Sequence, residues 1–233
     1  MCGFLSAQRE RFEMDSGLRF RKADINDIDD IDRIYQRTHD AEEAGVITTG
    51  WKRMVYPVRA TAVAALERDD LFVLVDDGRI IGSGIINQIQ VDVYEGAPWK
   101  YPVPDDQVCV LHTMMISPAE FGKGYAREFL EFYEKYALEH GCTELRIDTN
   151  ARNKAARAMY RKHGYSEIDI VPTTFNGIPE IRLVLLEKDL DPKRELFLKQ
   201  KQLLDTFLEK GAISKAQYDK SLGDMKEKRG IRE

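Results

Sequence analysis

The sequence predicts an α/β fold with a mixed, mainly antiparallel sheet flanked by helices, followed by a two-helix hairpin. Two turn signals between apolar runs indicate β-hairpins, and strand patterns elsewhere alternate with amphipathic helical patterns. Hairpins combined with strand–helix–strand units give a sheet that has both antiparallel and parallel neighbours. Past Asp191-Pro192 the strand patterns end and Lys and Arg are in excess, which predicts a separate helical segment.

The first part of the chain is predicted to contain a strand, a helix, a loop and a second helix. After a polar lead-in at residues 1–17, the run Leu18 to Ala23 predicts a strand. Asp24 has a side chain suited to capping the next helix. One face of that helix carries the apolar residues Ile28, Ile31, Ile34 and Tyr35. Residues 41–57 are predicted to form a loop before a helix near Val58 to Glu67.

A hairpin is predicted next, because Asp76-Asp77-Gly78 separates apolar runs at Leu71 to Val75 and Arg79 to Gln90. Residues 95–106 contain three prolines and two adjacent aspartates, which is typical of a loop. The apolar run Val108 to Ile116 then predicts a buried strand.

The segment Phe121-Gly-Lys-Gly-Tyr-Ala126 lies between that strand and an amphipathic helix. The helix is indicated by the spacing of Ala126, Phe129, Leu130, Tyr133 and Ala137. A glycine-bearing turn that opens a helix exposes several backbone N–H groups at the positive end of the helix dipole. We therefore expect an anion site here, and a diphosphate is a suitable ligand.

The remaining elements complete the predicted sheet. Thr143 to Thr149 predicts another strand, and a short helix with its C-terminal end covers Asn153 to Gly164. Tyr165 to Val171 and Glu180 to Glu187 predict a final hairpin around Phe175-Asn-Gly177.

The glycine turn at residues 121–126 and the segment at residues 153–165 resemble two motifs of the GNAT family of acyl-CoA N-acyltransferases. The family's phosphate-loop motif, Gln/Arg-x-x-Gly-x-Gly/Ala, reads Phe121-Gly-Lys-Gly124-Tyr-Ala126 here. The second half of its signature, N-x-x-A-x-x-x-Y-x-x-x-G-F/Y, reads Asn153-Lys-Ala-Ala156-Arg-Ala-Met-Tyr160-Arg-Lys-His-Gly164-Tyr165. The resemblance spans residues 18–190 and implies the GNAT fold, with acetyl-CoA as cofactor and coenzyme A as product. Phe121 stands where the family has Arg or Gln, which removes one polar contact near the pyrophosphate.

The resemblance also implies which residues form the cofactor site. The predicted cofactor-binding residues are Met114, Met115, Ile116, Phe121, Gly122, Lys123, Gly124, Tyr125, Ala126 and Asn153. Met114 and Met115 are alternatively core or tunnel wall, and Asn153 alternatively caps local backbone. Tyr160 matches the family tyrosine near the CoA sulfur, whose phenol would protonate the thiolate or hydrogen-bond to it. The other interpretation of Tyr160 is a half-buried tyrosine with a satisfied hydroxyl.

The group that accepts the proton of the amine has two candidates. His112 lies on the strand beside the thioester path and has a suitable ordinary pKa, although a strand histidine also serves as a packing residue. Asp148 lies on the neighbouring strand and would act through water, and water alone is a third possibility. Trp51, Tyr56 and Arg59 are predicted to bind the acceptor, or else to pack. No metal site is expected.

Three functions remain open from the sequence. The first is an acetyl-CoA-dependent N-acetyltransferase that modifies a primary amine of a small molecule, an amino acid or a peptide. The second is a protein N-terminal or lysine acetylase, whose acceptor cleft would be open and acidic, as Asp105 and Asp106 allow. The third is an acyl-CoA-binding sensor or assembly module that acts through the C-terminal segment.

Residues 193–233 are predicted to form a helical hairpin of the SHOCT-like kind. The first helix ends at Gly211, and Ser214 with Gln217 forms a capping box before the second. The apolar stripes consist of Leu196, Leu203, Leu204, Phe207 and Leu208, and of Tyr218, Leu222 and Met225. Because so short a segment buries little apolar surface alone, we expect homo-oligomer formation, docking of another protein, or packing on its own domain.

Composition excludes several other classes of function. The net charge of −5 and the absence of a basic block argue against nucleic acid as a partner. No apolar run approaches the ~20 residues that a membrane span needs, and the N-terminus lacks the apolar core of a secretory signal. The three cysteines form no CxxC pair and are expected to be reduced thiols. A cytoplasmic location is therefore expected, with neither membrane nor nucleic acid as a partner.

Overall fold

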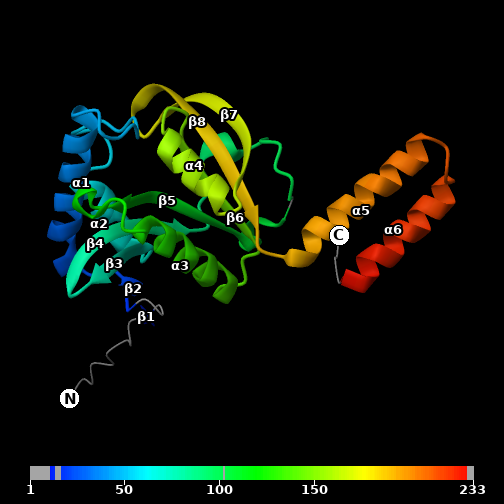
Figure 1. Cartoon of the computed structure of the whole chain (residues 1–233), viewed down its shortest axis with the longest axis horizontal. Coiled ribbons are helices and arrows are strands. Elements are labelled where there is room, and N and C mark those ends of the chain that lie inside the picture. The colour runs from blue at the N-terminus through cyan, green and yellow to red at the C-terminus, as the bar shows by residue number, and fades with distance from the viewer. Residues whose placement is uncertain (1–10, 14–16, 102, 230–233) are drawn as a thin grey trace, which may run out of the picture. The chain divides into compact units, whose positions relative to one another are not determined.

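The structure, a computed structural model, describes residues 11–13, 17–101 and 103–229 (Figure 1). The chain divides into two compact units at Lys188 and Asp189. The first unit contains the sheet and its helices, and the second is a pair of helices.

The first unit is built on an eight-stranded sheet with the strand order β1-β2-β3-β4-β5-β6-β8-β7. Its strands are β1 (Arg11–Glu13), β2 (Arg19–Lys22), β3 (Leu71–Asp76), β4 (Arg79–Asn87), β5 (Val108–Ile116), β6 (Glu144–Asn150), β7 (Ser166–Phe175) and β8 (Ile178–Asp189). β5 and β6 are parallel, whereas β1 to β5 pair antiparallel in succession and β7 pairs antiparallel with β8. The predicted mixed, mainly antiparallel sheet is therefore confirmed.

The helices of this unit also follow the predicted order. They are α1 (Ile28–Glu43), α2 (Arg59–Glu67), α3 (Tyr125–Glu139) and α4 (Lys154–Lys162). Short 3-10 turns lie at η1 (Ile25–Asp27), η2 (Asp92–Tyr94), η3 (Asp105–Gln107) and η4 (Pro118–Glu120). The part of the predicted lead-in that the structure describes, Arg11–Glu13, differs from the expectation because it forms β1 and pairs with β2. Residues 1–10 and 14–16 of that segment lie outside the described residues.

Helices cover both faces of the first half of the sheet. Val73 of β3 lies in a buried cluster with Ile31 of α1 and Ala62 of α2. Its neighbour Phe72 points the other way, and its ring centroid lies 5.6 Å from that of Phe132 on α3. Because successive strand residues point to opposite faces, α1 and α2 cover one face and α3 the other. Each buried aromatic or aliphatic side chain of this kind contributes roughly 1.5–3 kcal/mol by leaving water.

A second core cluster lies on the other half of the sheet, under the connection between β4 and β5. Val108 and Val110 of β5 pack there with Leu183 of β8. Tyr94 of η2, which is 2 % exposed, belongs to the same cluster, and Trp99 packs against it. The connection that the sequence predicts to be a loop is therefore folded onto the sheet.

The parallel pair β5–β6 separates partway along its length. Cα pairing runs from Val108 opposite Glu144 to Leu111 opposite Ile147. β5 then continues to Ile116 and β6 to Asn150. The register between β4 and β5 shifts in the same region, where Thr113 has a φ of 49°. The two strands therefore diverge beyond Leu111, and the backbone of β5 has a free edge there.

The second unit consists of α5 (Pro192–Glu209) and α6 (Lys215–Arg229). The predicted capping box is present: Ser214 N donates to Gln217 Oε1 at 2.8 Å, and Gln217 N donates to Ser214 Oγ at 3.2 Å. The Tyr218 hydroxyl joins the helices by donating to Asp205 at 2.5 Å. The two-helix hairpin is therefore confirmed, whereas its likeness to SHOCT domains stays a prediction. Among the residues that the structure describes, no helix combines the length and the hydrophobicity needed to cross a membrane.

Candidate active site

A cleft of about 1110 Å³ opens where β5 and β6 diverge. Its walls come from β5, β6, α2, α4, the η4–α3 turn and the loop between α1 and α2. The predicted site residues that line it are Trp51, Tyr56, His112, Met114, Met115, Ile116, Phe121, Gly122, Gly124, Tyr125, Ala126, Asp148, Asn153 and Tyr160. Two predicted residues, Arg59 and Lys123, are not among its lining residues.

The glycine turn forms one end of the cleft. Gly122 and Gly124 have φ values of 81° and 88°, a region that favours glycine, and Gly124 is the N-cap of α3. The backbone N–H groups of residues 122–126 donate no hydrogen bond to any described residue. A Cβ built on either glycine would meet no atom within 4 Å, so there is room beside the backbone. Free N–H groups at a helix start with space in front of them fit a diphosphate.

The side chains of this turn point elsewhere. Lys123 Nζ lies 2.6 Å from Glu120 Oε2 and is paired there rather than in the cleft. The Tyr125 hydroxyl donates to Asp76 at 2.7 Å, which fixes the first residue of α3 to the β3–β4 turn. Phe121 remains 46 % exposed. The backbone of the turn, and not its charged side chain, is therefore the part that is free to hold an anion.

On β5 and at the start of α4, some of the predicted cofactor-binding residues also have a structural role. Met115 is 4 % exposed and belongs to the core under α1 and α2, whereas Met114 is half-buried at the cleft. Asn153 is the N-cap of α4 and accepts a hydrogen bond from Ala156 N at 3.2 Å. Asn153 therefore caps the local backbone and also lines the cleft, so capping does not conflict with the predicted contact with the cofactor.

Asp148 and Tyr160 both line the cleft and lie close enough to interact electrostatically. Burial raises the pKa of the Asp148 carboxyl from 3.8 to about 6, and a hydrogen bond from Tyr94 to Oδ2 at 3.0 Å opposes part of that rise. Its Oδ1 has no partner among the described residues. Burial also raises the pKa of the Tyr160 phenol, and the nearby Asp148 adds to that effect. The Tyr160 hydroxyl has no hydrogen-bond partner among the described residues, and Tyr160 lines the cleft.

His112 is held by a hydrogen-bond chain away from Asp148. Asn87 Nδ2 donates to Asp70 Oδ2 at 2.8 Å, so Asn87 Oδ1 is left as an acceptor. His112 Nε2 lies 3.1 Å from that oxygen, and we assign the ring proton to Nε2 on this basis. Burial lowers the pKa of His112 to about 4, with the Ile89 backbone opposing part of the shift. The imidazole is therefore neutral and a weak base at neutral pH.

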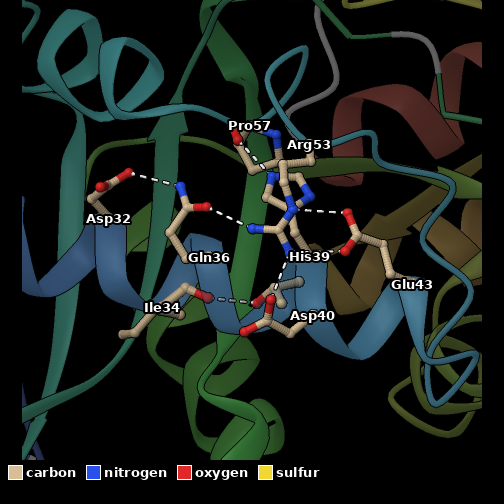
Figure 2. Close-up of polar contacts among 9 residues, drawn as sticks. Asp32, Ile34, Gln36, His39, Asp40, Glu43, Arg53 and Pro57 are labelled. Atoms are coloured by element: carbon tan, nitrogen blue, oxygen red, sulfur yellow. Dashed lines mark hydrogen bonds and ion pairs between the residues drawn. The ribbon is translucent and has the colours of Figure 1, made fainter.

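The loop between α1 and α2 contributes Trp51 and Tyr56 to the cleft lining and is fixed to α1 (Figure 2). The guanidinium of Arg53 reaches three side chains of α1: Nε donates to Glu43 at 2.8 Å, and its terminal nitrogens donate to Asp40 at 2.6 Å and Gln36 at 2.9 Å. His39 Nε2 lies 2.9 Å from the Pro57 carbonyl oxygen. These contacts hold both halves of the loop, although the sequence predicts only an irregular connection.

The same loop also reaches β6 on the far side of the cleft. Glu42 accepts the N–H of Gly50 at 3.0 Å, and the Thr48 hydroxyl donates to the Arg152 carbonyl at 3.0 Å. Gly50 has a φ of 78°, and a Cβ built on it would lie 2.2 Å from Asn150 Nδ2. A Cβ at Gly50 would require the Asn150 side chain to move, so the loop approaches the end of β6 closely at this residue.

Gly50→Ala is expected to destabilise the protein more than Gly45→Ala, a matched control. Both glycines have positive φ, and each substitution costs about 1 kcal/mol for that reason. At Gly45 the new Cβ meets nothing within 4 Å, whereas at Gly50 it displaces Asn150. Chemical denaturation measures the difference, and equal losses would contradict the close approach of the loop to β6.

The acceptor residues predicted from the sequence are found only in part. Trp51 and Tyr56 line the cleft with ring centroids 6.2 Å apart, and the Tyr56 hydroxyl is hydrogen-bonded to Thr113. Arg59 pairs with Asp29 at 2.8 Å and is not among the cleft-lining residues, so its role in acceptor binding stays a prediction. At the first position of α2 it reaches the first turn of α1.

Three further cleft or near-cleft residues were not predicted. Arg68 at the end of α2 lines the cleft and is paired with Asp70 at 2.8 Å. Asn87 at the end of β4 orients His112. Tyr94 reaches Asp148 from the connection between β4 and β5. The spacing of Thr61, Ala64 and Arg68 places them on one helical face, which is a sequence signal for Arg68 as a cleft residue. No local sequence pattern indicates the position of Tyr94.

Comparison with known proteins identifies the family. The model of the acetyltransferase (GNAT) family matches residues 29–165, which is more than half of the chain. A search of curated proteins finds no significant match.

Solved structures share the fold at low sequence identity. A GNAT-family acetyltransferase from Streptococcus agalactiae matches with a TM-score of 0.63 and 22% identity over 77% of this chain and 98% of its own. The protein yncA of Salmonella typhimurium, determined with its cofactor acetyl-CoA, has a TM-score of 0.55 and 17% identity over 75% and 95%. The ribosomal-protein-S18-alanine N-acetyltransferase of Escherichia coli has a TM-score of 0.52 and 17% identity over 74% and 94%. At these identities the likeness establishes the fold.

Proposed function

Because this chain belongs to the GNAT family of acetyltransferases, whose acyl donor is acetyl-CoA, we propose that it acetylates a primary amine of a small molecule, an amino acid or a peptide. The observation that carries the proposal is the arrangement of one cleft. Free backbone N–H groups at the start of α3, the unpaired oxygen of Asp148 and the hydroxyl of Tyr160 all border this cleft.

The binding role falls to backbone groups. The N–H groups of residues 122–126 would hold the diphosphate of acetyl-CoA, and the free edge of β5 at Met114 to Ile116 would pair with the pantetheine amides. Acetyl-CoA supplies a thioester whose carbonyl carbon accepts the amine. Fixing both reactants in one cleft removes much of the entropic barrier to their reaction.

We assign proton acceptance from the amine to Asp148 in preference to His112. An alkylamine has a pKa near ~10 and arrives as an ammonium ion. The pKa of Asp148 is about 6 and that of His112 about 4, so transfer to Asp148 is easier by two units, or roughly 3 kcal/mol. Asp148 also presents an oxygen without a partner among the described residues, whereas the His112 ring is engaged by Asn87 and by the Ile89 backbone. His112 then serves to shape the wall of the cleft.

Tyr160 is proposed to supply a proton to the departing thiolate. Its phenol stays protonated at neutral pH because burial and the nearby Asp148 raise its pKa. Its hydroxyl has no partner among the described residues and is free to donate in the cleft. Tyr160 and Asp148 thus divide the two proton transfers of the reaction between them.

A small acceptor fits better than a folded protein. The loop between α1 and α2 spans the acceptor end and is tied to β6 through Gly50 and to the β6–α4 turn through Thr48. Asp105 and Asp106, on which an acidic peptide-binding cleft would depend, are not among the cleft-lining residues. Asp105 instead accepts a hydrogen bond from Gln90 at 2.7 Å.

A sensor that only binds acyl-CoA is the non-enzymatic alternative. Such a protein has no need of a buried carboxylate with a raised pKa next to a free phenol, because keeping that carboxylate desolvated costs stability. The presence of both groups in the cleft supports an enzyme.

The test is release of free thiol from acetyl-CoA against panels of small amines, amino acids and peptides, with binding measured separately. Saturating acetyl-CoA at one hundred times its Kd should stabilise the protein by ~2.7 kcal/mol. Gly124→Asp should abolish this gain by placing a negative charge at the diphosphate, whereas Gly124→Ala carries only the backbone strain. Stabilisation without thiol release on any panel would favour the sensor, and no stabilisation would remove the cofactor assignment.

A further inference from the structure

The connection between β4 and β5 carries a tyrosine that reaches Asp148 from outside the two sequence motifs. Tyr94 lies in η2, is 2 % exposed, and donates its hydroxyl hydrogen bond to Asp148 Oδ2 at 3.0 Å. It is the contact that fixes one oxygen of the carboxylate, and it leaves Oδ1 without a partner among the described residues.

Tyr94 is itself held in place by the rest of the connection. The indole Nε1 of Trp99 donates to the Tyr94 carbonyl at 3.0 Å, and the two rings meet edge to face with centroids 5.2 Å apart. The Arg146 guanidinium lies 4.1 Å above the Trp99 ring. The backbone N–H of Lys100 donates to both carboxylate oxygens of Glu187 on β8, at 3.0 and 3.1 Å. The segment is therefore anchored to β6 and β8, and the position of the Tyr94 hydroxyl is set by packing.

Asp148 differs from the other carboxylate of the cleft. Glu120 pairs with Lys123, so its charge is compensated by the protein. Among the described residues, Tyr94 is the side chain hydrogen-bonded to Asp148, and no described cation lowers the pKa of this carboxyl. A desolvated carboxylate without a cation keeps its charge only through such hydrogen bonds.

We infer that Tyr94 is the positioning residue for Asp148: its hydrogen bond holds Oδ2 so that Oδ1 faces the acceptor amine. The inference rests on the proposed function. In the reaction the ammonium gives one proton to Oδ1, and the nitrogen lone pair forms the N–C bond. The C–S bond breaks with its electron pair going to sulfur, and the second amine proton ends on sulfur by way of Tyr160. Asp148 then releases its proton to water.

The titration of Asp148 can be followed without interference from its neighbours. Three phenols act on it or respond to it: Tyr56, whose pKa burial raises to about 12, and Tyr94 and Tyr160, whose pKa values burial raises above their usual range. All three keep their protons between pH 4 and pH 8. His112 titrates at the acidic end and is hydrogen-bonded to Asn87 rather than to Asp148.

The experiment is a carbon-13 NMR titration of the full-length protein labelled at the aspartate carboxyl carbon. Asp148→Asn identifies the Asp148 signal by its loss. Tyr94→Phe removes the hydrogen bond that stabilises the carboxylate, so the pKa of Asp148 should rise by about one unit. Tyr218→Phe is the matched control, because it removes a tyrosine–aspartate hydrogen bond, to Asp205, between residues that do not line the cleft. It should leave the Asp148 signal unchanged.

The outcomes separate this inference from the proposed function. If Tyr94→Phe lowers the melting temperature but leaves the Asp148 titration in place, Tyr94 is a packing residue and the inference is overturned. If the titration moves and an amine substrate is known, the acidic limb of kcat/KM should move to higher pH by the same amount. If the titration moves in a protein that acetylates no amine, the contact is supported and the proposed function fails.

Discussion

Asp148→Asn is expected to stop amine acetylation while making the protein more stable at alkaline pH. The substitution removes the proton acceptor of the cleft and keeps an oxygen for the hydrogen bond from Tyr94. Loss of a positioned acid or base typically costs about 10²–10⁴-fold in rate. Turnover at saturating acetyl-CoA measures this loss, and the affinity for acetyl-CoA should stay unchanged because Asp148 is not part of the glycine turn.

The stability change follows from the raised pKa of Asp148. Because the folded protein binds this proton more tightly than the unfolded chain does, the contribution to stability is fully present below about pH 4. It is lost as the pH rises through about 6, where the buried carboxylate becomes charged. The shift of about two units corresponds to roughly 3 kcal/mol. The free energy of unfolding of Asp148→Asn, measured by chemical denaturation, should therefore equal that of the native protein near pH 4. At pH 8 it should be higher by roughly 2–3 kcal/mol.

His112→Gln gives the comparison that decides between the two candidate proton acceptors. Glutamine retains an amide that can donate to Asn87, so the wall of the cleft is conserved. We expect this variant to keep most of its activity. An inactive His112→Gln enzyme beside an active Asp148→Asn enzyme would transfer the role of proton acceptor to His112.

Tyr160→Phe is expected to lower turnover by about 10²–10⁴-fold with little change in acetyl-CoA affinity. Only the hydroxyl is removed, and that hydroxyl has no structural hydrogen bond to a described residue. The melting temperature should therefore be nearly unchanged, which separates a role in proton transfer from a role in packing. Rapid-quench measurement of the chemical step avoids masking by slow product release.

Tyr165→Phe provides the matched control for this variant. The Tyr165 ring meets the Tyr160 ring edge to face at 5.8 Å, and its hydroxyl is buried without a hydrogen-bond partner. Tyr165 does not line the cleft, so its variant should retain activity and be as stable as the native protein or more so. Equal losses of activity in both variants would show that Tyr160 acts through packing.

The sequence by itself determined the order of the elements and the cofactor end of the site. The periodicities of α1 and α3, the turn at Asp77-Gly78 and the apolar run of β5 are local signals, and each predicted element is present. The glycine turn could also be predicted from the local sequence, because free N–H groups at the start of a helix depend on only a few consecutive residues. Its spacing to Asn153 and Tyr160 indicated the family.

Only the tertiary structure shows which predicted residues line the cleft and distinguishes the two candidates for the proton acceptor. Arg59 begins α2 and Arg68 directly follows its last residue, and only packing determines that Arg68 lines the cleft while Arg59 pairs with Asp29. The ordinary pKa of histidine is higher than that of aspartate, so the sequence favours His112 as the base. In the folded protein the pKa of Asp148 is the higher of the two. Burial lowers the pKa of a base and raises that of an acid, and burial is a property of the whole fold. Tyr94 reaches Asp148 from a connection without local periodicity, because long-range contacts between β6, β8 and that connection fix its position.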